Sequence, residues 1–204
     1  MVNIKKKTGK EKEKPSARAL RNRYVCAALF AALIAVSGFF IIPIPGGIPL
    51  VLKNLFVVLA GTVLGAGYGG ISVLIFIAAG VLGIPVFVIP GGPGVFLTPL
   101  GGYVAGYLAG SLAAGLICGL PQTSEKKAGI GAIARLAAGS FLGFALIVLT
   151  GALYMMRLNS MSFKAAMLAG VVPFIPGDLL KCAISVPLAL KLRPIAARYI
   201  NPHA

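Results

Sequence analysis

The chain has 204 residues, of which 58% are hydrophobic and 11% are charged, and its mean hydropathy is +0.97. Soluble domains carry about 25% charged residues, so this composition excludes an ordinary soluble domain. The net charge of +15 does not indicate a nucleic-acid-binding protein, because nine of the 19 basic residues lie together at 5–23, ahead of an apolar body. Since a membrane span needs about 20 apolar residues, we expect one integral membrane domain.

The first 23 residues form a separate basic segment. They are too polar to be buried, the basic stretch is too long for a secretory signal, and no small-residue cleavage pattern follows the first apolar run. We therefore predict a disordered cytoplasmic tail over 1–23 and a single six-helix transmembrane domain over 24–200.

Six hydrophobic runs follow in chain order. Because lipid cannot satisfy an open backbone, each run is expected to be a helix, which makes the fold class an all-α membrane protein. The runs are 24–42, 50–64, 71–89, 100–120, 130–156 and 163–190. Turn-forming stretches separate them at 43–49, 65–70, 90–99, 121–127 and 157–164. The last run is overlong, and we expect it to be a helix broken at Pro173 and Pro176.

The basic residues predict the orientation. With the N-terminus inside, fourteen of the 19 fall in cytoplasmic segments, including Lys191, Arg193 and Arg198, and only Arg157 and Lys164 fall in outside loops. By the positive-inside rule, both termini are expected in the cytoplasm, which requires an even number of spans.

Small residues recur at helical spacing. Glycines every four residues, as at 102, 106 and 110, predict close helix packing within the domain. The first span carries alanines in two adjacent stripes, Ala27, Ala31 and Ala35 and, beside them, Ala28 and Ala32. These alanines either pack inside the domain or form a docking face for another membrane subunit.

One acidic residue lies in the membrane body. The chain has four acids, and Asp178 is the one outside the tail and the loops. Its spacing from Lys181 places both on one helical face. An ionisable residue within a span is by default a functional candidate, and a helix restarting after Pro176 presents N–H groups that suit an anionic ligand. The alternative is that Asp178 caps this helix and Lys181 is its counter-ion.

Lys53 and Asn54 are expected at a similar depth, at the outer end of the second run. The lysine either contacts a ligand or extends outward to the surface, and the asparagine either contacts a ligand or bridges helices. The predicted membrane body has one acid and no histidine, and the chain has no GxxxxGK[ST] motif, so we expect no enzyme, no metal site and no cofactor. The leading class is a solute-binding membrane protein, and a non-transporting structural subunit is the alternative.

Four sequence elements, in order, carry a family resemblance. They are PGGIPLVLKN (45–54) leading into LAGTVLG (59–65), GVLGIPVF (80–87), TPLGGY (98–103) and PFIPGDLLK (173–181). Together they resemble the BioY family, the biotin-specific substrate-binding subunits of energy-coupling factor transporters. The resemblance implies six transmembrane helices in the cytoplasmic membrane and biotin bound near the extracellular side. It also implies, as partners, a transmembrane coupling protein and two ATP-binding-cassette ATPases. A subunit for another small vitamin is the alternative.

The resemblance also assigns residues. The family's binding aspartate and lysine match Asp178, suited to accept the ureido N–H groups of biotin, and Lys181, which either pairs with the ligand carboxylate or holds Asp178. The other residues matched to the binding site are Phe87, Thr98, Gly101, Gly102 and Tyr103. The chain departs from the family at Lys53 and Asn54, where a Thr-Leu-Gln type sequence is usual, and both are added as candidates. The docking face for the coupling protein is predicted at Ala27, Ala28, Ala31, Ala32 and Ala35.

Overall fold

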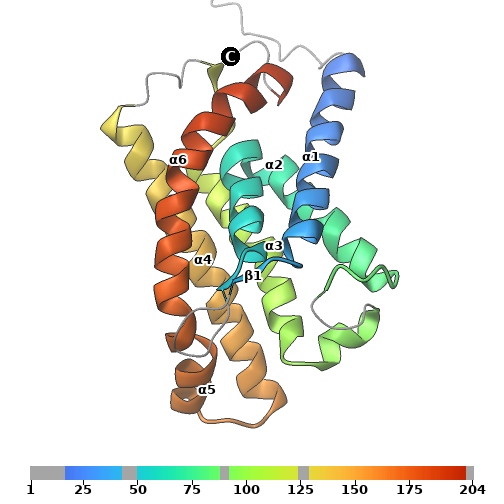
Figure 1. Ribbon diagram of the computed structural model, residues 1–204, viewed down its shortest axis with the longest axis vertical. Coiled ribbons are helices and arrows are strands. Elements are labelled where there is room, and N and C mark those ends of the chain that lie inside the picture. The colour runs from blue at the N-terminus through green and yellow to red at the C-terminus, as the bar shows by residue number, and fades with distance from the viewer. Residues whose placement is uncertain (1–16, 43–49, 88–91, 124–128, 201–204) are drawn as a thin grey trace, which may run out of the picture.

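The computed structural model describes residues 17–42, 50–87, 92–123 and 129–200. In Figure 1 the long helices lie alongside one another, and the beginning of the first helix and the end of the last lie at the same end of the bundle. A hydrogen bond joins these two ends, since Arg23 Nε donates to the carbonyl oxygen of Ile200 at 2.7 Å.

The helices of the bundle are α1 (Ala17–Ser37), α2 (Lys53–Val81), α3 (Leu100–Cys118), α4 (Ile130–Leu158), α5 (Phe163–Gly170) and α6 (Ile175–Ile200). Short 3₁₀ helices precede α3, as η1 (Pro93–Leu97), and α6, as η3 (Val172–Phe174). Two short strands, β1 (Ile41–Ile42) and β2 (Leu50–Val51), pair antiparallel between α1 and α2, with Ile41 opposite Val51.

The basic segment is helical at its C-terminal end. α1 begins at Ala17, so the prediction of disorder over 1–23 is wrong for residues 17–23. These residues extend the apolar helix by two turns because the chain from Ala17 onward contains no proline or glycine until Gly38. Residues 1–16, and the predicted turn at 43–49, lie outside the described residues.

α2 covers most of the second and third predicted runs, but it ends at Val81 and not at residue 89, and it changes direction at Gly65. This residue has φ +79°, a conformation that favours glycine. Beyond it the chain folds back, and a Cβ built on Gly69 would lie 2.6 Å from the carbonyl oxygen of Ala60. Figure 1 shows the two halves of α2 running in different directions. The turn predicted over 65–70 is therefore reduced to one residue, since residues 66–70 are helical.

The first half of α2 is the centre of the bundle. Residues 57–65 are all buried, and their sequence, VVLAGTVLG, has no polar stripe that would require contact with water. A helix that is apolar on every side is stable only when it is surrounded. α1, in contrast, leaves large side chains such as Leu29, Leu33 and Val36 exposed on its outer face.

The glycine spacing brings α3 and α4 into close contact, as the sequence predicts. A Cβ built on Gly110 would lie 2.6 Å from the carbonyl oxygen of Gly143, and one on Gly139 would lie 2.6 Å from Sγ of Cys118. The side of α3 that carries Gly102 and Gly106 meets the same helix around Thr150. Small residues at these positions let two backbones approach without a side chain between them.

Five segments are long and apolar enough to cross a membrane within the described residues: Ala17–Ser37, Lys53–Val81, Leu100–Cys118, Ile130–Leu158 and Phe163–Ile200. The last of these is interrupted, as predicted at Pro173. α5 ends at Gly170, Val171 leaves the helical conformation, and α6 begins at Ile175. Pro176 is not a second break, because it lies in the first turn of α6, where proline is tolerated.

Arg193 is a structural residue and does not lie in a cytoplasmic loop, which corrects its place in the charge count. It is 1% exposed, inside α6. Its Nη1 donates to the carbonyl oxygens of Thr62 and Gly119, and its Nη2 donates at 3.1 Å to those of Cys118 and Leu120. The last carbonyls of a helix lack intrahelical donors and carry partial negative charge. Arg193 therefore joins α6 to the C-terminal end of α3 and to α2.

Candidate functional site

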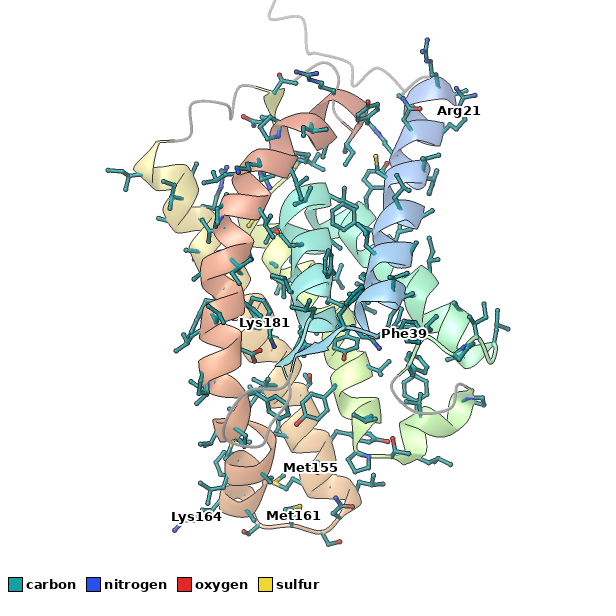
Figure 2. The ribbon with its side chains drawn as sticks, in the orientation of Figure 1. Arg21, Phe39, Met155, Met161, Lys164 and Lys181 are labelled. Atoms are coloured by element: carbon teal, nitrogen blue, oxygen red, sulfur yellow. The ribbon has the colours of Figure 1, made fainter. Side chains whose placement is uncertain are left out.

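The candidate site is built around an ion pair on α6. Nζ of Lys181 lies 2.6 Å from Oδ1 of Asp178, and the two residues are 3% and 8% exposed. Figure 2 shows Lys181 on the side of α6 that faces the other helices. Asp178 is the one acidic residue that the described part of the chain contains. A buried pair of this kind needs both partners, because either charge alone is costly in an apolar environment.

The break before α6 positions this pair. Because α6 begins at Ile175, Asp178 lies in its first turn and is not a capping residue. The capping alternative is therefore wrong, whereas its second element, Lys181 as the counter-ion of Asp178, is confirmed. The free N–H groups and the positive dipole end of the helix favour negative charge at this depth.

Two tyrosines of α3 lie close to the ion pair. Tyr103 and Tyr107 are one turn apart on the same face, and the carboxylate of Asp178 interacts electrostatically with both phenol groups. The Tyr103 hydroxyl donates to the carbonyl oxygen of Gly170 at 2.9 Å, and its ring centroid lies 6.0 Å from that of Phe174. Tyr103 therefore connects α3 to the break at which the charged turn of α6 begins.

Lys53 forms a second charged centre, at the start of α2. It is 2% exposed, its Nζ donates to the carbonyl oxygen of Val86 at 2.8 Å, and it lies 5.2 Å from the centroid of the Phe76 ring. The interpretation that Lys53 extends outward to the surface is therefore wrong. The Phe76 ring lies 6.2 Å from that of Tyr107 and 5.5 Å from that of Phe87. Aromatic rings thus form a continuous connection from Lys53 to the tyrosines beside Asp178.

An apolar cavity adjoins Asp178 between α4 and α6. Its volume is about 270 Å³. The lining residues are Phe141, Phe144, Ala145, Val148, Val171, Ile175, Asp178, Leu179 and Cys182. Asp178 is the single charged residue among them, and the wall of the cavity is almost entirely apolar. Phe141 and Leu179 of this wall are exposed, so the cavity opens to the outer surface of the bundle.

Comparison with known proteins identifies the family. A sequence profile of the BioY family matches residues 10–198. The chain belongs to the BioY family. It is 37% identical over 167 residues to the probable biotin transporter BioY of Pyrococcus horikoshii, an alignment that covers 81% of this chain and 93% of that one. It is 32% identical over 170 residues to the biotin transporter BioY of Thermotoga maritima, with 83% and 94% covered.

A solved structure agrees with this assignment. The crystal structure of the S-component for biotin from an ECF-type ABC transporter superposes with a TM-score of 0.72 at 27% sequence identity, covering 88% of this chain and 94% of that one. Together with the apolar helices, the transporter relatives make this chain a membrane protein of a transporter family, and not of an enzyme family.

Three of the residues matched to the BioY site, Thr98, Gly101 and Gly102, have packing roles. The Thr98 hydroxyl donates to the carbonyl oxygen of Val95 at 2.7 Å, which closes η1. A Cβ built on Gly101 would lie 2.8 Å from Cα of Phe96, and Gly102 packs directly against Tyr154 of α4. These residues hold η1 and the start of α3 in place, and Tyr154 assists because its hydroxyl donates to the carbonyl oxygen of Phe96.

Phe87, another matched residue, and Asn54, one of the two added candidates, lie near Lys53. Phe87 is 8% exposed and packs edge-on against Phe76, while a glycine at position 80 leaves room for its ring. Asn54 is half-buried beside Lys53. Phe87 therefore shapes the surroundings of Lys53 and lies in a different cluster from the ion pair of α6.

The alanines of α1 divide into two sets. Ala27 and Ala31 are 0% and 5% exposed and Ala35 is half-buried, whereas Ala28 and Ala32 are exposed. A docking role for Ala27 and Ala31 is therefore wrong, because these residues pack inside the bundle. Ala28 and Ala32 lie on the adjacent stripe and are accessible from outside.

Sequence reasoning missed Phe76 and Tyr107. Both lie in apolar helical runs, where most aromatic residues face lipid or the core. For Tyr107 the available signal was its spacing of four residues from Tyr103, which places both on one face of α3. Phe76 carries no comparable signal, because its role depends on the reversal of the chain at Gly65.

Proposed function

We propose that this protein is the biotin-binding subunit of an energy-coupling factor transporter, which takes up biotin across the cytoplasmic membrane. The observation that carries the proposal is the buried Asp178–Lys181 pair, which adjoins both an apolar cavity and the tyrosine face of α3. Membership of the BioY family and the names of the relatives support it.

The chemistry of biotin fits these groups. As a carboxylate, Asp178 accepts the two ureido N–H donors, and charge-assisted hydrogen bonds of this kind are stronger than neutral ones. Tyr103 and Tyr107 offer aromatic surface to the fused ring. Either Lys53 or Lys181 supplies positive charge for the carboxylate of the ligand.

The proposed topology has six spans with both termini in the cytoplasm. The reversal at Gly65 divides α2 into two passes. Together with the other four long segments, this makes six passes. Because six is an even number, both ends of the chain then lie on the same side of the membrane. In this orientation the charged turn of α6, η1 and the β1–β2 pair lie toward the extracellular side, where the vitamin enters.

The proposed partners are a transmembrane coupling protein and two ATP-binding-cassette ATPases. The chain contains no GxxxxGK[ST] sequence with which to bind ATP itself. The exposed alanines Ala28 and Ala32 support a docking face on α1, because small residues let a helix of a partner approach closely.

Binding calorimetry on the detergent-solubilised protein tests the proposal. Wild-type protein should bind biotin, and Asp178→Asn and Lys181→Met should each lower the affinity by about 10-fold or more. Lys164→Met is the matched control, because Lys164 is exposed and its loss removes the same charge. Undiminished affinity in both site variants would refute the site, and competition by thiamine or riboflavin in place of desthiobiotin would refute the choice of vitamin.

A further inference from the structure

Lys53 is a buried cation whose charge no carboxylate of the described chain balances. Asp178, the one acid in that part of the chain, has Nζ of Lys181 at 2.6 Å from its Oδ1. Within the described residues, the Lys53 ammonium contacts the carbonyl oxygen of Val86 at 2.8 Å and the Phe76 ring at 5.2 Å. Both are neutral groups, and a charge buried among neutral groups is costly unless another ion joins it.

Neighbouring segments of the chain pack around the Lys53 side chain and hold its ammonium in place. A Cβ built on Gly38, just after α1, would lie 2.5 Å from Cε and 2.7 Å from Nζ of Lys53. Lys53 is therefore enclosed by the end of α1, the start of α2 and the segment after α2. An ammonium has three N–H donors, and Val86 uses one of them.

The two lysines of the site differ in whether the ammonium is already paired with a carboxylate. Lys181 is engaged by Asp178, and any movement of its ammonium toward a ligand would weaken the pair that orients the carboxylate. Lys53, in contrast, has no carboxylate partner in the part of the chain that the structure describes. The rings of Phe76 and Tyr107 connect the two centres, so a ligand lying along them would have one end at Asp178 and the other at Lys53.

We propose that Lys53 binds the carboxylate of the ligand, while Lys181 holds Asp178 in position for the ureido group. This assignment rests on the proposed function and goes further, because it makes Lys53 the residue that selects a free carboxylic acid over uncharged derivatives of the same vitamin. An ammonium paired with a carboxylate away from water makes a charge-assisted bond that an amide or an ester cannot replace.

The test compares biotin with biotin amide, in which the ureido ring is kept and the carboxylate charge is lost. Affinities of both are measured by calorimetry for wild-type protein, Lys53→Met, Lys53→Arg, Lys181→Met and the control Lys164→Met. Unfolding temperatures without ligand identify any variant that fails to fold. Lys53→Arg keeps the charge and provides a second reading if Lys53→Met is unstable.

We expect wild-type protein to prefer biotin by about 10- to 100-fold. Lys53→Met should lose this preference by binding biotin more weakly while its affinity for the amide changes less than about threefold, and Lys53→Arg should retain part of the preference. Lys181→Met should weaken both ligands together. A preference that survives in Lys53→Met, or an equal loss of both ligands, would overturn the assignment and leave the proposed function intact. Wild-type protein that binds neither ligand would refute the function itself.

Discussion

Replacing Asp178 with asparagine removes the negative charge beside Lys181 at almost constant shape. With Nζ and Oδ1 2.6 Å apart, their attraction is about 6 kcal/mol at an effective dielectric constant of about 20. Several kcal/mol per ion are lost again because both groups leave water, so the net contribution of the intact pair is small. Removing only the carboxylate is different, because the ammonium stays buried alone.

We therefore expect Asp178→Asn to lower the free energy of unfolding by about 3–5 kcal/mol. For a chain of this length, that corresponds to a fall of roughly 6–20 °C in the unfolding temperature. The double variant Asp178→Asn/Lys181→Met carries neither charge and should recover at least half of the loss. Lys164→Met should unfold like the wild type.

The assay uses the chain's own cysteines. Cys118 is 1% exposed, so a thiol-reactive fluorophore reports its exposure as the detergent-solubilised protein is heated without biotin. A single variant within about 1 kcal/mol of the wild type would refute the reasoning. So would a double variant that is no more stable than the single one, because the penalty would then not arise from an unpaired buried charge.

Three further predictions concern the bundle and its outer face. Arg193→Lys should lower the free energy of unfolding by about 2–4 kcal/mol in the same thermal assay. The reason is that one ammonium cannot replace a guanidinium group that donates to several carbonyl oxygens. Stability equal to the wild type would contradict this. Gly110→Val should cost at least about 2 kcal/mol, since its Cβ would lie 2.6 Å from the Gly143 carbonyl oxygen, and an unchanged unfolding temperature would show that α3 and α4 separate easily. Ala32→Leu should reduce co-purification with the coupling protein, while biotin affinity and stability stay unchanged. Ala31 lies inside the bundle, so Ala31→Leu should reduce stability first. The reverse pattern would exclude the docking face.

The parts of the site that depend on local spacing were predictable from the sequence. Asp178 and Lys181 are three residues apart, so any helix through them brings them together, and Pro173 predicts the break that precedes them. The glycines of α3 were equally informative, because glycines spaced by four residues lie on one side of a helix and let a neighbouring helix approach closely.

Features that depend on distant segments were not predictable in this way. The burial of Lys53 depends on Val86 and Phe76, which approach it only because α2 reverses at Gly65. Arg193 lies three residues beyond the end of a predicted run, where a basic residue ordinarily faces the cytoplasm, and only the meeting of α3 with α6 buries it. For α1, helical spacing separated two alanine stripes, but contacts with the rest of the bundle decided which of them faces inward.

α6 is held at two distant places, by the ring contact between Tyr103 and Phe174 just before its first turn and by Arg193 near its last turns. Pro187 lies between them and, lacking an N–H group, leaves the carbonyl of Ala183 without its usual helical donor. The stretch around Pro187 is consequently the most easily bent part of a rod that is held at both ends, so a tilt imposed at one anchor is absorbed there before it reaches the other.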